Sequence, residues 1–502
     1  MRLTIAQIIE FSRALTVVPA RDQQQVIQRL TWDSRNVQPD MLFVALPGER
    51  VDGNEFIVEA FERGAAVVIA SRQVTEAERR VAQQYRAALL YATDAQLALW
   101  RLASAWRESL DAKVIGITGS SGKTSTRALV SAVLERAFLT VSSIGNRNNE
   151  IGLPATVLSA SSSTEMLVVE MAMRGLGQIE ELAAIARPHI GVVTKIGPVH
   201  LELLGSKDNV ARAKAEMISA LPDGSGIAIL NGDDPYTPRI RELARTFERE
   251  IRVLLFGLGA HNDIRAAALD FDEEGQPSFD LWLRDGQPRR VHLKLRGEHS
   301  VYNALAAAAT AVSLGVESRH IVAALEQAQP APMRQVFSEL EDGSLLIDDS
   351  YNANPDSMRA ALEMLGRLPN DRPHIAVLGD MGELGVEAVD LHERIGRTAF
   401  LNNTDVLVTV GALARSYAQG ALESGMGAER VIICADSEEA LAALALLRAD
   451  KPIMLVKGSR FMELDRLVAL LKENGQPNGQ PSTPPASDDG RPPIPAEAEA
   501  IG

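Results

Sequence analysis

The residues with the clearest chemical meaning form a glycine-rich turn. It consists of Gly119, Ser120, Ser121, Gly122, Lys123, Thr124 and Ser125. The apolar run VIGIT precedes this turn and a stretch with helical spacing follows it, the usual context of a phosphate-binding loop. Glycines let backbone N–H groups converge on phosphate oxygens, the lysine adds positive charge, and the threonine hydroxyl can bind Mg²⁺. The longer form of such loops has a glycine where this chain has Ile117, so the match is to the shorter pattern GxxGKT. We interpret the turn as a nucleotide-binding loop.

Two further side chains could hold a metal ion beside that loop. Glu170 ends the apolar run MLVVE, and His200 follows soon after the run IGVVT. In an open parallel sheet, ligands collect at the carboxyl ends of the strands, so both residues could face the loop. Taken alone, a glutamate at a strand end is as often a solvated turn residue, and a lone histidine is more often structural. Their shared placement favours a metal site.

Several other polar residues leave a structural and a chemical interpretation open. Lys214 lies on a predicted helix, where an ordinary lysine would belong to a solvated face. His299 and Asn303 could begin a helix or present polar groups to a base. Asp349 ends the run LLIDD, and Arg334 is placed where it could reach a phosphate. The residue pattern alone does not decide these roles.

The elements that must position these residues alternate between strand and helix. The first segment has an amphipathic stretch over 5–15, strand-like runs over 41–46 and 65–70, and a helix-like run through Trp100 and Trp106. The second begins with the strand, loop and helix around the nucleotide-binding loop. It continues with strand-like runs over 166–170, 190–194 and 227–230. This alternation predicts a parallel sheet covered by helices on both faces.

Two later regions have different patterns. Between 251 and 296, RVLLFG, FDLWLR and VHLKLR alternate apolar and polar residues, which predicts a small antiparallel patch. From residue 330 onward, five apolar runs separated by helical stretches predict a second doubly wound α/β unit. The Pro-, Gly- and Ser-rich tail 473–502 is expected to be disordered. We therefore predict an α/β protein with domains at 1–110, 111–328 and 329–472.

Composition narrows the classes of function. The 502 residues agree with about three domains. A formal net charge of −15 argues against a general nucleic-acid binder, which would need a basic face. A single cysteine, Cys434, excludes an internal disulfide and a cysteine-based zinc cluster. We find neither a signal peptide nor an apolar run of about 20 residues that would span a membrane. We expect a cytoplasmic monomer that does not bind membranes.

Several long motifs give the chain a family resemblance. TGSSGKTS, GEHSVYNALAA and ARAKAE together resemble the Mur ligases, the ATP-dependent amide ligases of peptidoglycan synthesis. Further motifs are similar to those of the members that join D-alanyl-D-alanine to UDP-N-acetylmuramoyl-tripeptide. These are NRNNEIGLPATVL, GPVHLELLGS, IDDSYNANPDSM, VLGDMGELG and VKGSRFMELD. The resemblance implies a UDP-precursor-binding domain, a central ATPase-like domain and a C-terminal Rossmann-like domain that binds D-alanyl-D-alanine. Two stretches depart from the family: Lys195 stands where asparagine is frequent, and APMRQ surrounds Arg334 where PGR-like sequences are usual.

The resemblance also implies roles for individual residues. ATP would lie on Gly119–Ser125, with His299 and Asn303 on the adenine side and Arg334 and Asp349 reaching phosphates and ribose. Thr124 and Glu170 would hold one Mg²⁺ and His200 would help to hold a second. Lys214 matches the lysine that the family carbamylates, which turns it into an anionic oxygen ligand. Together with Lys123, the residues expected to be catalytic are Glu170, His200, Lys214 and Arg334. Those expected to contact the other substrates are Ser34, Arg35, Asn146, Asn148, Asn149, Tyr351, Asn352 and Asn354.

The expected reaction has two steps. The γ-phosphate of ATP activates the peptide carboxylate as an acyl phosphate, and the amine of the dipeptide then attacks the activated carbonyl. Positive groups must neutralise the charge that develops in the first step, which Lys123, Arg334 and Mg²⁺ would do. Two alternatives stay open at this point: a folylpolyglutamate-synthase-like ligase, and a nucleotide-binding switch without ligase activity.

Overall fold

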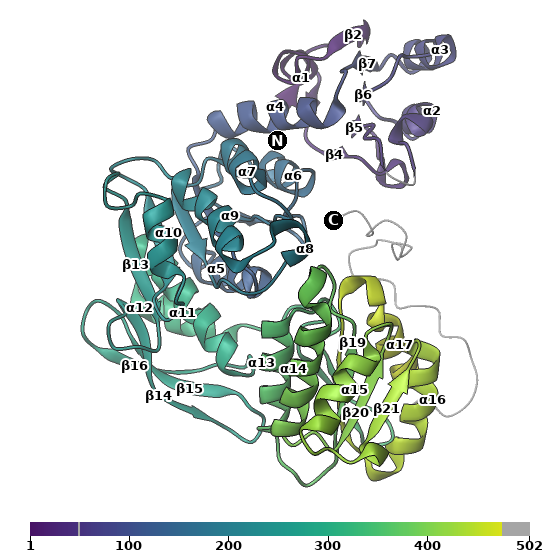
Figure 1. Cartoon of the computed structure of the whole chain (residues 1–502). Helices are drawn as coiled ribbons and strands as arrows, with labels where there is room; N and C mark the ends of the chain where they lie inside the picture. The colour runs from purple at the N-terminus through teal and green to yellow at the C-terminus, as the bar shows by residue number, and fades with distance from the viewer. Residues whose placement is uncertain (49–50, 474–502) are drawn as a thin grey trace.

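The computed structural model describes residues 1–48 and 51–473. In this part of the chain, three large β-sheets form, each flanked by helices (Figure 1). We name the units by their sheets: five-stranded (β2 and β4–β7), nine-stranded (β8–β16) and six-stranded (β17–β22). The predicted α/β class is confirmed. Apart from Glu473, the predicted tail lies outside the described residues. Among the described residues, no helix combines the length and the apolar character that crossing a bilayer requires.

The five-stranded unit contains most of the first predicted segment. Its strand order is β2-β7-β6-β5-β4, and only β2 runs antiparallel to its neighbour. The strands are β2 (Leu15–Val18), β4 (Leu30–Thr31), β5 (Leu42–Val44), β6 (Val67–Ala70) and β7 (Ala88–Tyr91), and a separate pair joins β1 (Leu3–Thr4) to β3 (Val26–Ile27). The helices are α1 (Ile5–Ser12), α2 (Ile57–Glu62), α3 (Glu76–Tyr85) and α4 (Ala95–Glu108). Helix α4 ties this unit to the next, because the Trp106 indole donates to the Ala160 carbonyl at 3.0 Å.

The nine-stranded unit places the glycine-rich turn directly after β8, an inner strand of its sheet. The order is β16-β15-β14-β13-β12-β11-β8-β10-β9, and the strands from β9 to β14 run parallel. The strands are β8 (Lys113–Thr118), β9 (Thr140–Ser142), β10 (Met166–Glu170), β11 (Ile190–Val193), β12 (Ile227–Asn231), β13 (Arg252–Gly257), β14 (Ile264–Phe271), β15 (Pro277–Trp282) and β16 (Pro288–His292). The helices are α5 (Lys123–Leu134), α6 (Gly152–Ser159), α7 (Gln178–Ala186), α8 (Leu201–Leu204), α9 (Lys207–Ser219), α10 (Thr237–Leu243), α11 (Glu298–Ser313) and α12 (Ser318–Gln327).

Helices cover both faces of this sheet, as predicted. In β10, Leu167 and Val169 belong to the apolar cluster shared with α7 and α9. Met166 and Val168 belong to the opposite cluster, which is shared with α5 and α11. Successive residues of a strand point to opposite faces, so an uninterrupted apolar run is the expected sequence of a strand buried on both sides.

One prediction about this region is wrong in part. RVLLFG, expected in a small antiparallel patch, is β13, and it pairs in parallel with β12. The antiparallel strands β15 and β16 extend the same sheet through β14, a strand that the sequence analysis did not predict. Strand β14 carries exposed and half-buried residues over its second half, so it has no continuous apolar run to mark it.

The six-stranded unit contains all five strands predicted after residue 330. Its order is β17-β18-β22-β19-β20-β21, with only the edge strand β17 antiparallel. The strands are β17 (Val336–Glu339), β18 (Leu345–Asp348), β19 (His374–Gly379), β20 (Val406–Val410), β21 (Val431–Cys434) and β22 (Ile453–Lys457). The helices are α13 (Pro355–Leu365), α14 (Ala388–Leu401), α15 (Ala414–Glu423), α16 (Ser437–Leu447) and α17 (Leu464–Glu473). In Figure 1 this unit lies beside the nine-stranded unit, with α13 near their boundary.

Candidate active site

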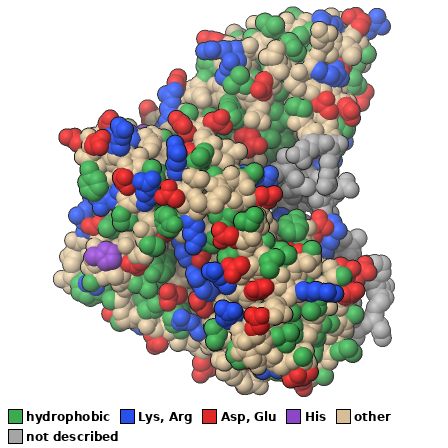
Figure 2. Space-filling view, viewed as in Figure 1, with side chains coloured by type: hydrophobic (Ala, Val, Ile, Leu, Met, Phe, Trp, Pro, Cys, Tyr) green, Lys and Arg blue, Asp and Glu red, His purple; other side chains and the backbone are tan. Residues whose placement is uncertain are grey.

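A cleft of about 1250 Å³ lies where the nine-stranded and six-stranded units meet. Its walls include the glycine-rich turn, the segments after β10 and β11, the start of α11, and residues 349–357 of the six-stranded unit. On the face shown in Figure 2, lysine and arginine side chains gather near this boundary, although the chain as a whole is acidic. The carboxyl ends of parallel strands thus converge on one site, as expected for this kind of sheet.

The glycine-rich turn has the geometry of a phosphate-binding loop. Gly122, the N-cap residue of α5, has a φ of 79°, and a Cβ there would lie 2.5 Å from the Asn303 side-chain oxygen. That oxygen accepts a hydrogen bond from Thr126 at 3.1 Å, so Asn303 of α11 packs directly against the turn. Lys123 Nζ donates to the Gly119 carbonyl at 2.7 Å, and burial lowers the pKa of this lysine. The residues predicted to hold a nucleotide are therefore assembled in one place.

Thr124 and Glu170 lie side by side, as the metal prediction requires. Thr124 Oγ1 donates to Glu170 Oε2 at 2.9 Å, and Asn148 Nδ2 donates to the other carboxylate oxygen at 2.8 Å. Arg334 Nη2 reaches the same Thr124 hydroxyl at 3.1 Å from the other side of the cleft. A hydroxyl and a carboxylate beside a phosphate-binding loop form the oxygen-rich environment that Mg²⁺ prefers, so these residues fit that ion. No group of three or more His, Cys, Asp or Glu side chains with metal-binding geometry occurs among the described residues.

His200 and Lys214 have different surroundings. His200 lines the cleft, and its Nδ1 atom contacts the Glu383 carboxylate of the six-stranded unit. Lys214 of α9 is only 1% exposed, which rules out the solvated-face interpretation. In the described part of the chain, its ammonium group forms neither a hydrogen bond nor an ion pair. Burial, together with the positive charge of Lys123, lowers the pKa of Lys214 well below its usual value.

The six-stranded unit contributes residues to the opposite wall. The Arg334 guanidinium lies 4.2 Å from the Tyr351 ring centroid, a cation–π arrangement. Asp349, expected to reach the ribose, forms a buried ion pair with Lys457 at 2.8 Å. Lys457 also donates to the Asn352 carbonyl at 2.9 Å and so supports the turn that carries Tyr351. Half-buried His299 lies within range of the Asp349 charge; desolvation lowers the pKa of its imidazole, and Asp349 partly opposes this shift.

The asparagines predicted to contact substrates have structural partners as well. Asn354 caps α13 through the Ser357 backbone N–H at 2.9 Å, and its Nδ2 atom donates to the Ser120 carbonyl at 3.4 Å. Asn149 accepts from the Gly152 backbone N–H at 2.9 Å, where α6 begins. Asn146 lines the cleft.

The structure does not bring Ser34 and Arg35 to the cleft. They form a short 3₁₀ turn of the five-stranded unit, where Arg35 is paired with Asp33 at 2.9 Å. That unit has a smaller cavity of about 470 Å³, lined partly by Asn54, Ser71 and Arg72. Neither Ser34 nor Arg35 lines it, and their predicted contact with a substrate stays a prediction.

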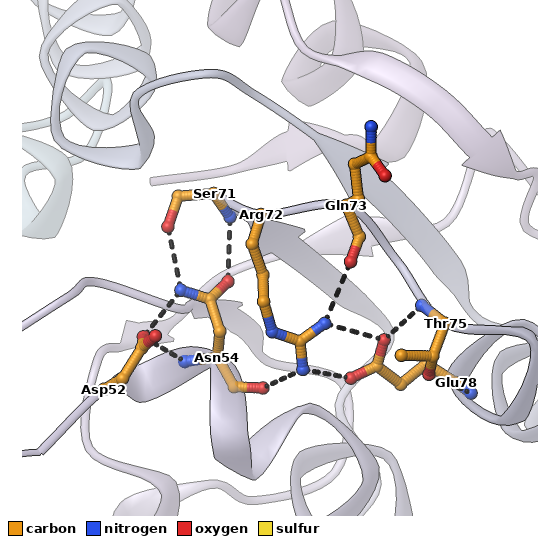
Figure 3. A network of polar contacts seen from close by, with 7 residues as sticks. All are labelled: Asp52, Asn54, Ser71, Arg72, Gln73, Thr75 and Glu78. Carbon is orange, nitrogen blue, oxygen red and sulfur yellow. Dashed lines mark hydrogen bonds and ion pairs between the residues drawn. The ribbon is translucent and has the colours of Figure 1, made fainter.

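A dense polar network shapes the wall of this smaller cavity (Figure 3). The Asn54 amide donates to Asp52 at 2.7 Å and to the Ser71 hydroxyl at 2.8 Å, and its oxygen accepts from the Ser71 backbone N–H at 2.9 Å. Arg72 forms a two-pronged pair with Glu78, at 2.6 and 3.2 Å. A planar pair of this kind fixes both side chains.

Three residues in or beside the site have no role that the sequence predicts. Lys457 and Glu383 lie within motifs that carry the family resemblance, VKGSRFMELD and VLGDMGELG, but only the fold shows which atoms they meet. Arg127 lies on α5, and its Nε atom is 3.7 Å from Glu170. An arginine on a predicted helix carries no signal that distinguishes it from a surface residue.

The fold and the cleft define a nucleotide-binding protein in which a P-loop faces a second α/β unit. Three family models match the chain: "Mur ligase family, catalytic domain" over 26–108, "Mur ligase middle domain" over 117–311, and "Mur ligase, glutamate ligase domain" over 333–460. The UDP-N-acetylmuramoyl-tripeptide–D-alanyl-D-alanine ligase of Mycobacterium tuberculosis is 39% identical over 93% of this chain and 98% of its own length. The chain belongs to the Mur ligase family.

Solved structures agree with this membership. A crystal structure of MurF from Acinetobacter baumannii has a TM-score of 0.83 and 33% identity, and covers 94% of this chain and 99% of that one. MurF from Thermotoga maritima in complex with ADP has a TM-score of 0.75 and 27% identity, over 89% of this chain and 98% of that one. Mycobacterium tuberculosis folylpolyglutamate synthase, at 18% identity, a TM-score of 0.61 and 75% and 93% coverage, shares the fold alone.

Proposed function

We propose that this protein joins D-alanyl-D-alanine to UDP-N-acetylmuramoyl-tripeptide, with ATP converted to ADP and phosphate, in peptidoglycan synthesis. The observation that carries the proposal is the meeting of Thr124, Glu170 and Arg334 across the cleft. The Thr124 hydroxyl belongs to the phosphate-binding loop. It lies within hydrogen-bond distance of the Glu170 carboxylate, which suits Mg²⁺, and of the Arg334 guanidinium from the facing unit. The MurF proteins that the chain is similar to over nearly its whole length support this substrate pair.

Activation of the carboxylate is the first proposed step. An oxygen of the tripeptide carboxylate attacks the γ-phosphorus of ATP, ADP leaves, and an acyl phosphate forms. Lys123 and Arg334 neutralise charge on the transferred group, and Tyr351 holds the Arg334 guanidinium in position. Thr124 and Glu170 would hold one Mg²⁺, and His200 with a carbamylated Lys214 would help to hold a second. When bound, the ions would supply further positive charge at the phosphates.

Amide formation is the second proposed step. The amine of D-alanyl-D-alanine attacks the acyl carbon, and the tetrahedral intermediate collapses to the amide with release of inorganic phosphate. We propose that Tyr351, Asn352 and Asn354 line the dipeptide pocket, because they lie on the wall that faces the P-loop. The acyl phosphate must be kept from water, which favours a reaction enclosed between the two units.

The environment of Lys214 supports its proposed carbamylation. An amine reacts with CO₂ only in its neutral form, giving a carbamate and releasing one proton. Burial lowers the pKa of Lys214, which increases the share of the neutral, reactive amine at any given pH. The carbamate converts a cation into an anionic oxygen ligand, the kind of group that Mg²⁺ binds.

We further propose that each of the three units binds a different substrate. The five-stranded unit binds the UDP end of the precursor through its smaller cavity, with Ser34 and Arg35 nearby in the same unit. The nine-stranded unit binds ATP, with Asn146, Asn148 and Asn149 extending its wall toward the peptide, and the six-stranded unit binds the dipeptide. Boundaries at residues 110 and 328 belong to the same proposal, and family-model matches over 26–108, 117–311 and 333–460 support it.

Phosphate release from purified protein tests the substrate assignment. Mg-ATP, UDP-N-acetylmuramoyl-tripeptide and D-alanyl-D-alanine are supplied together and then omitted one at a time. We expect release only when all three are present. A parallel reaction with a folate and glutamate should release none. Release that needs the folate pair would support the folylpolyglutamate-synthase-like alternative, and release with ATP alone would support a nucleotide-binding switch.

A further inference from the structure

A loop of the six-stranded unit docks onto the segment that carries His200. The loop follows β19, and the carbonyl of Glu383 accepts a hydrogen bond from the Glu202 backbone N–H at 3.2 Å. Gly385 lies so close to this segment that a Cβ on it would be 3.1 Å from the Glu202 Cα atom. The contact therefore joins the two units through main-chain atoms, immediately beside the cleft.

The Glu383 side chain occupies the centre of this contact. Its Oε2 atom contacts His200 Nδ1, and its Oε1 atom is 3.4 Å from Arg174 Nε. Both His200 and Glu383 have left-handed backbone conformations, with φ of 53° and 59°. Non-glycine residues adopt this conformation uncommonly and at a cost, so the backbone on both sides is held by the surrounding structure.

The position of the carboxylate determines which ring nitrogen of His200 can bind a metal. Among the described residues, the hydrogen-bond partner of the His200 ring is Glu383, at Nδ1. This leaves Nε2 to act as a metal ligand. A histidine that binds a metal usually donates its other ring N–H to a carboxylate or carbonyl, which fixes the tautomer and orients the ring. Here that carboxylate belongs to the facing unit, not to the unit that holds His200.

We propose that Glu383 is a positioning residue for His200, and that the second Mg²⁺ site forms completely only when the six-stranded unit is seated. This inference rests on the proposed function, in which His200 helps to hold that ion. Glu383 itself does not touch the metal or the reacting atoms. Orientation of the His200 imidazole requires the loop after β19 to be docked beside it. Charge neutralisation at the phosphates therefore requires the same contact between the two units.

A structural role for the His200–Glu383 pair and a role in metal binding predict different effects of removing Glu383. The side chains of His200 and Glu383 are 25% and 40% exposed, and pairs at such exposure are worth little to stability. Loss of a carboxylate that orients a metal-binding histidine, in contrast, typically weakens metal binding by about 10- to 100-fold. Metal affinity and thermal stability therefore separate the two roles.

The test titrates Mn²⁺, as a substitute for Mg²⁺, into the full chain saturated with ADP, with free Mn²⁺ measured by electron paramagnetic resonance. We expect two bound ions in the unchanged protein. Glu383→Ala should weaken the weaker site about 10- to 100-fold, and Glu383→Gln, which retains a hydrogen-bond acceptor, should have an intermediate effect. Glu387→Gln, an exposed carboxylate on the same segment, should bind both ions normally. His200→Ala should lose the weaker site, and adding Glu383→Ala to it should change nothing more.

Three results would overturn the inference. Glu383→Ala could bind both ions as the unchanged protein does, or it could weaken binding further in the His200→Ala background, in which case it does not act through His200. If His200→Ala bound both ions normally, the metal role of His200 would fail as well. Formation of the pentapeptide by the unchanged protein is measured separately, so failure of the proposed reaction is recognised independently. Thermal melting of each variant confirms that it is folded.

Discussion

Lys214 carries a polar group in a place where stability alone would favour an apolar one. It is 1% exposed and has no hydrogen-bond or ion-pair partner in the described part of the chain. Removing a charged group from water costs free energy, and such costs are commonly accepted at functional sites. The proposed carbamate explains why a lysine occupies this position.

Replacing Lys214 should therefore separate stability from activity. We expect Lys214→Met to raise the melting temperature by a few degrees, because a desolvated amine is replaced by an apolar chain of similar length. Product formation should be abolished, since a thioether cannot form a carbamate. The matched control is Lys207→Met, at the exposed start of the same helix, which should change stability by less than about 0.5 kcal/mol. A lower melting temperature for Lys214→Met would contradict this reasoning.

Glu78 gives a pH-dependent prediction away from the cleft. Burial raises the pKa of its carboxyl, but hydrogen bonds from Arg72 and Thr75 outweigh burial, so the pKa is lowered overall. The stability that this carboxylate contributes is present above its unfolded pKa of about 4.3 and is lost as pH falls through the folded value. We expect the unchanged protein to melt above Glu78→Gln at pH 7, with the difference shrinking toward pH 3. A constant difference across this range would show that the charge contributes nothing.

At the scale of elements, α13 begins at a residue that serves both the helix and the cleft. Asn354 caps the helix through Ser357 and also donates to the Ser120 carbonyl of the P-loop. Loss of a helix cap typically costs about 1 kcal/mol. The second contact, across the cleft, adds a functional consequence that an ordinary cap lacks.

Asn354→Ala should therefore differ from loss of a remote cap. Asp436 caps α16 of the same six-stranded unit, accepting from the Glu438 and Glu439 backbone N–H groups at 3.0 Å. We expect Asn354→Ala and Asp436→Ala to lose about 1 kcal/mol of unfolding free energy each. Only Asn354→Ala should raise the KM for ATP or for the dipeptide in steady-state kinetics. Equal kinetics in the two variants would mean that the contact with Ser120 has no functional role.

The elements that could be predicted were those with a continuous apolar run. Strands β10, β11 and β19 are buried on both faces, so their sequences mark them directly. Strand β14 is exposed or half-buried over its second half, β17 has no buried residue, and neither was predicted. The P-loop was predictable because its chemistry is contained in one short segment. The contacts of Glu383 and Lys457 were not, because each depends on how two distant segments pack.

At the scale of the whole molecule, the cleft residues come from two units that share one nucleotide site. A ligand that binds the folded state stabilises it, by about 2.7 kcal/mol when its concentration is 100 times its Kd. Because the proposed site spans both units, this stabilisation should extend to both. The five-stranded unit lies outside the site.

Hydrogen exchange with and without Mg-ADP measures this distribution. We expect slower exchange in the turn before α5, in residues 349–354 and in the loop after β19. Strands β5 and β6 of the five-stranded unit should exchange at unchanged rates and serve as the internal control. Protection confined to the nine-stranded unit would show that the six-stranded unit does not take part in nucleotide binding.

The most direct test of the proposed reaction follows an oxygen atom. UDP-N-acetylmuramoyl-tripeptide labelled with ¹⁸O in its reacting carboxylate is incubated with the protein, Mg-ATP and D-alanyl-D-alanine, and both products are analysed by mass spectrometry. Activation as an acyl phosphate predicts a pentapeptide that has lost one labelled oxygen and inorganic phosphate that has gained it. Unlabelled phosphate, or phosphate without pentapeptide, would contradict the account, because ATP would then be hydrolysed by water.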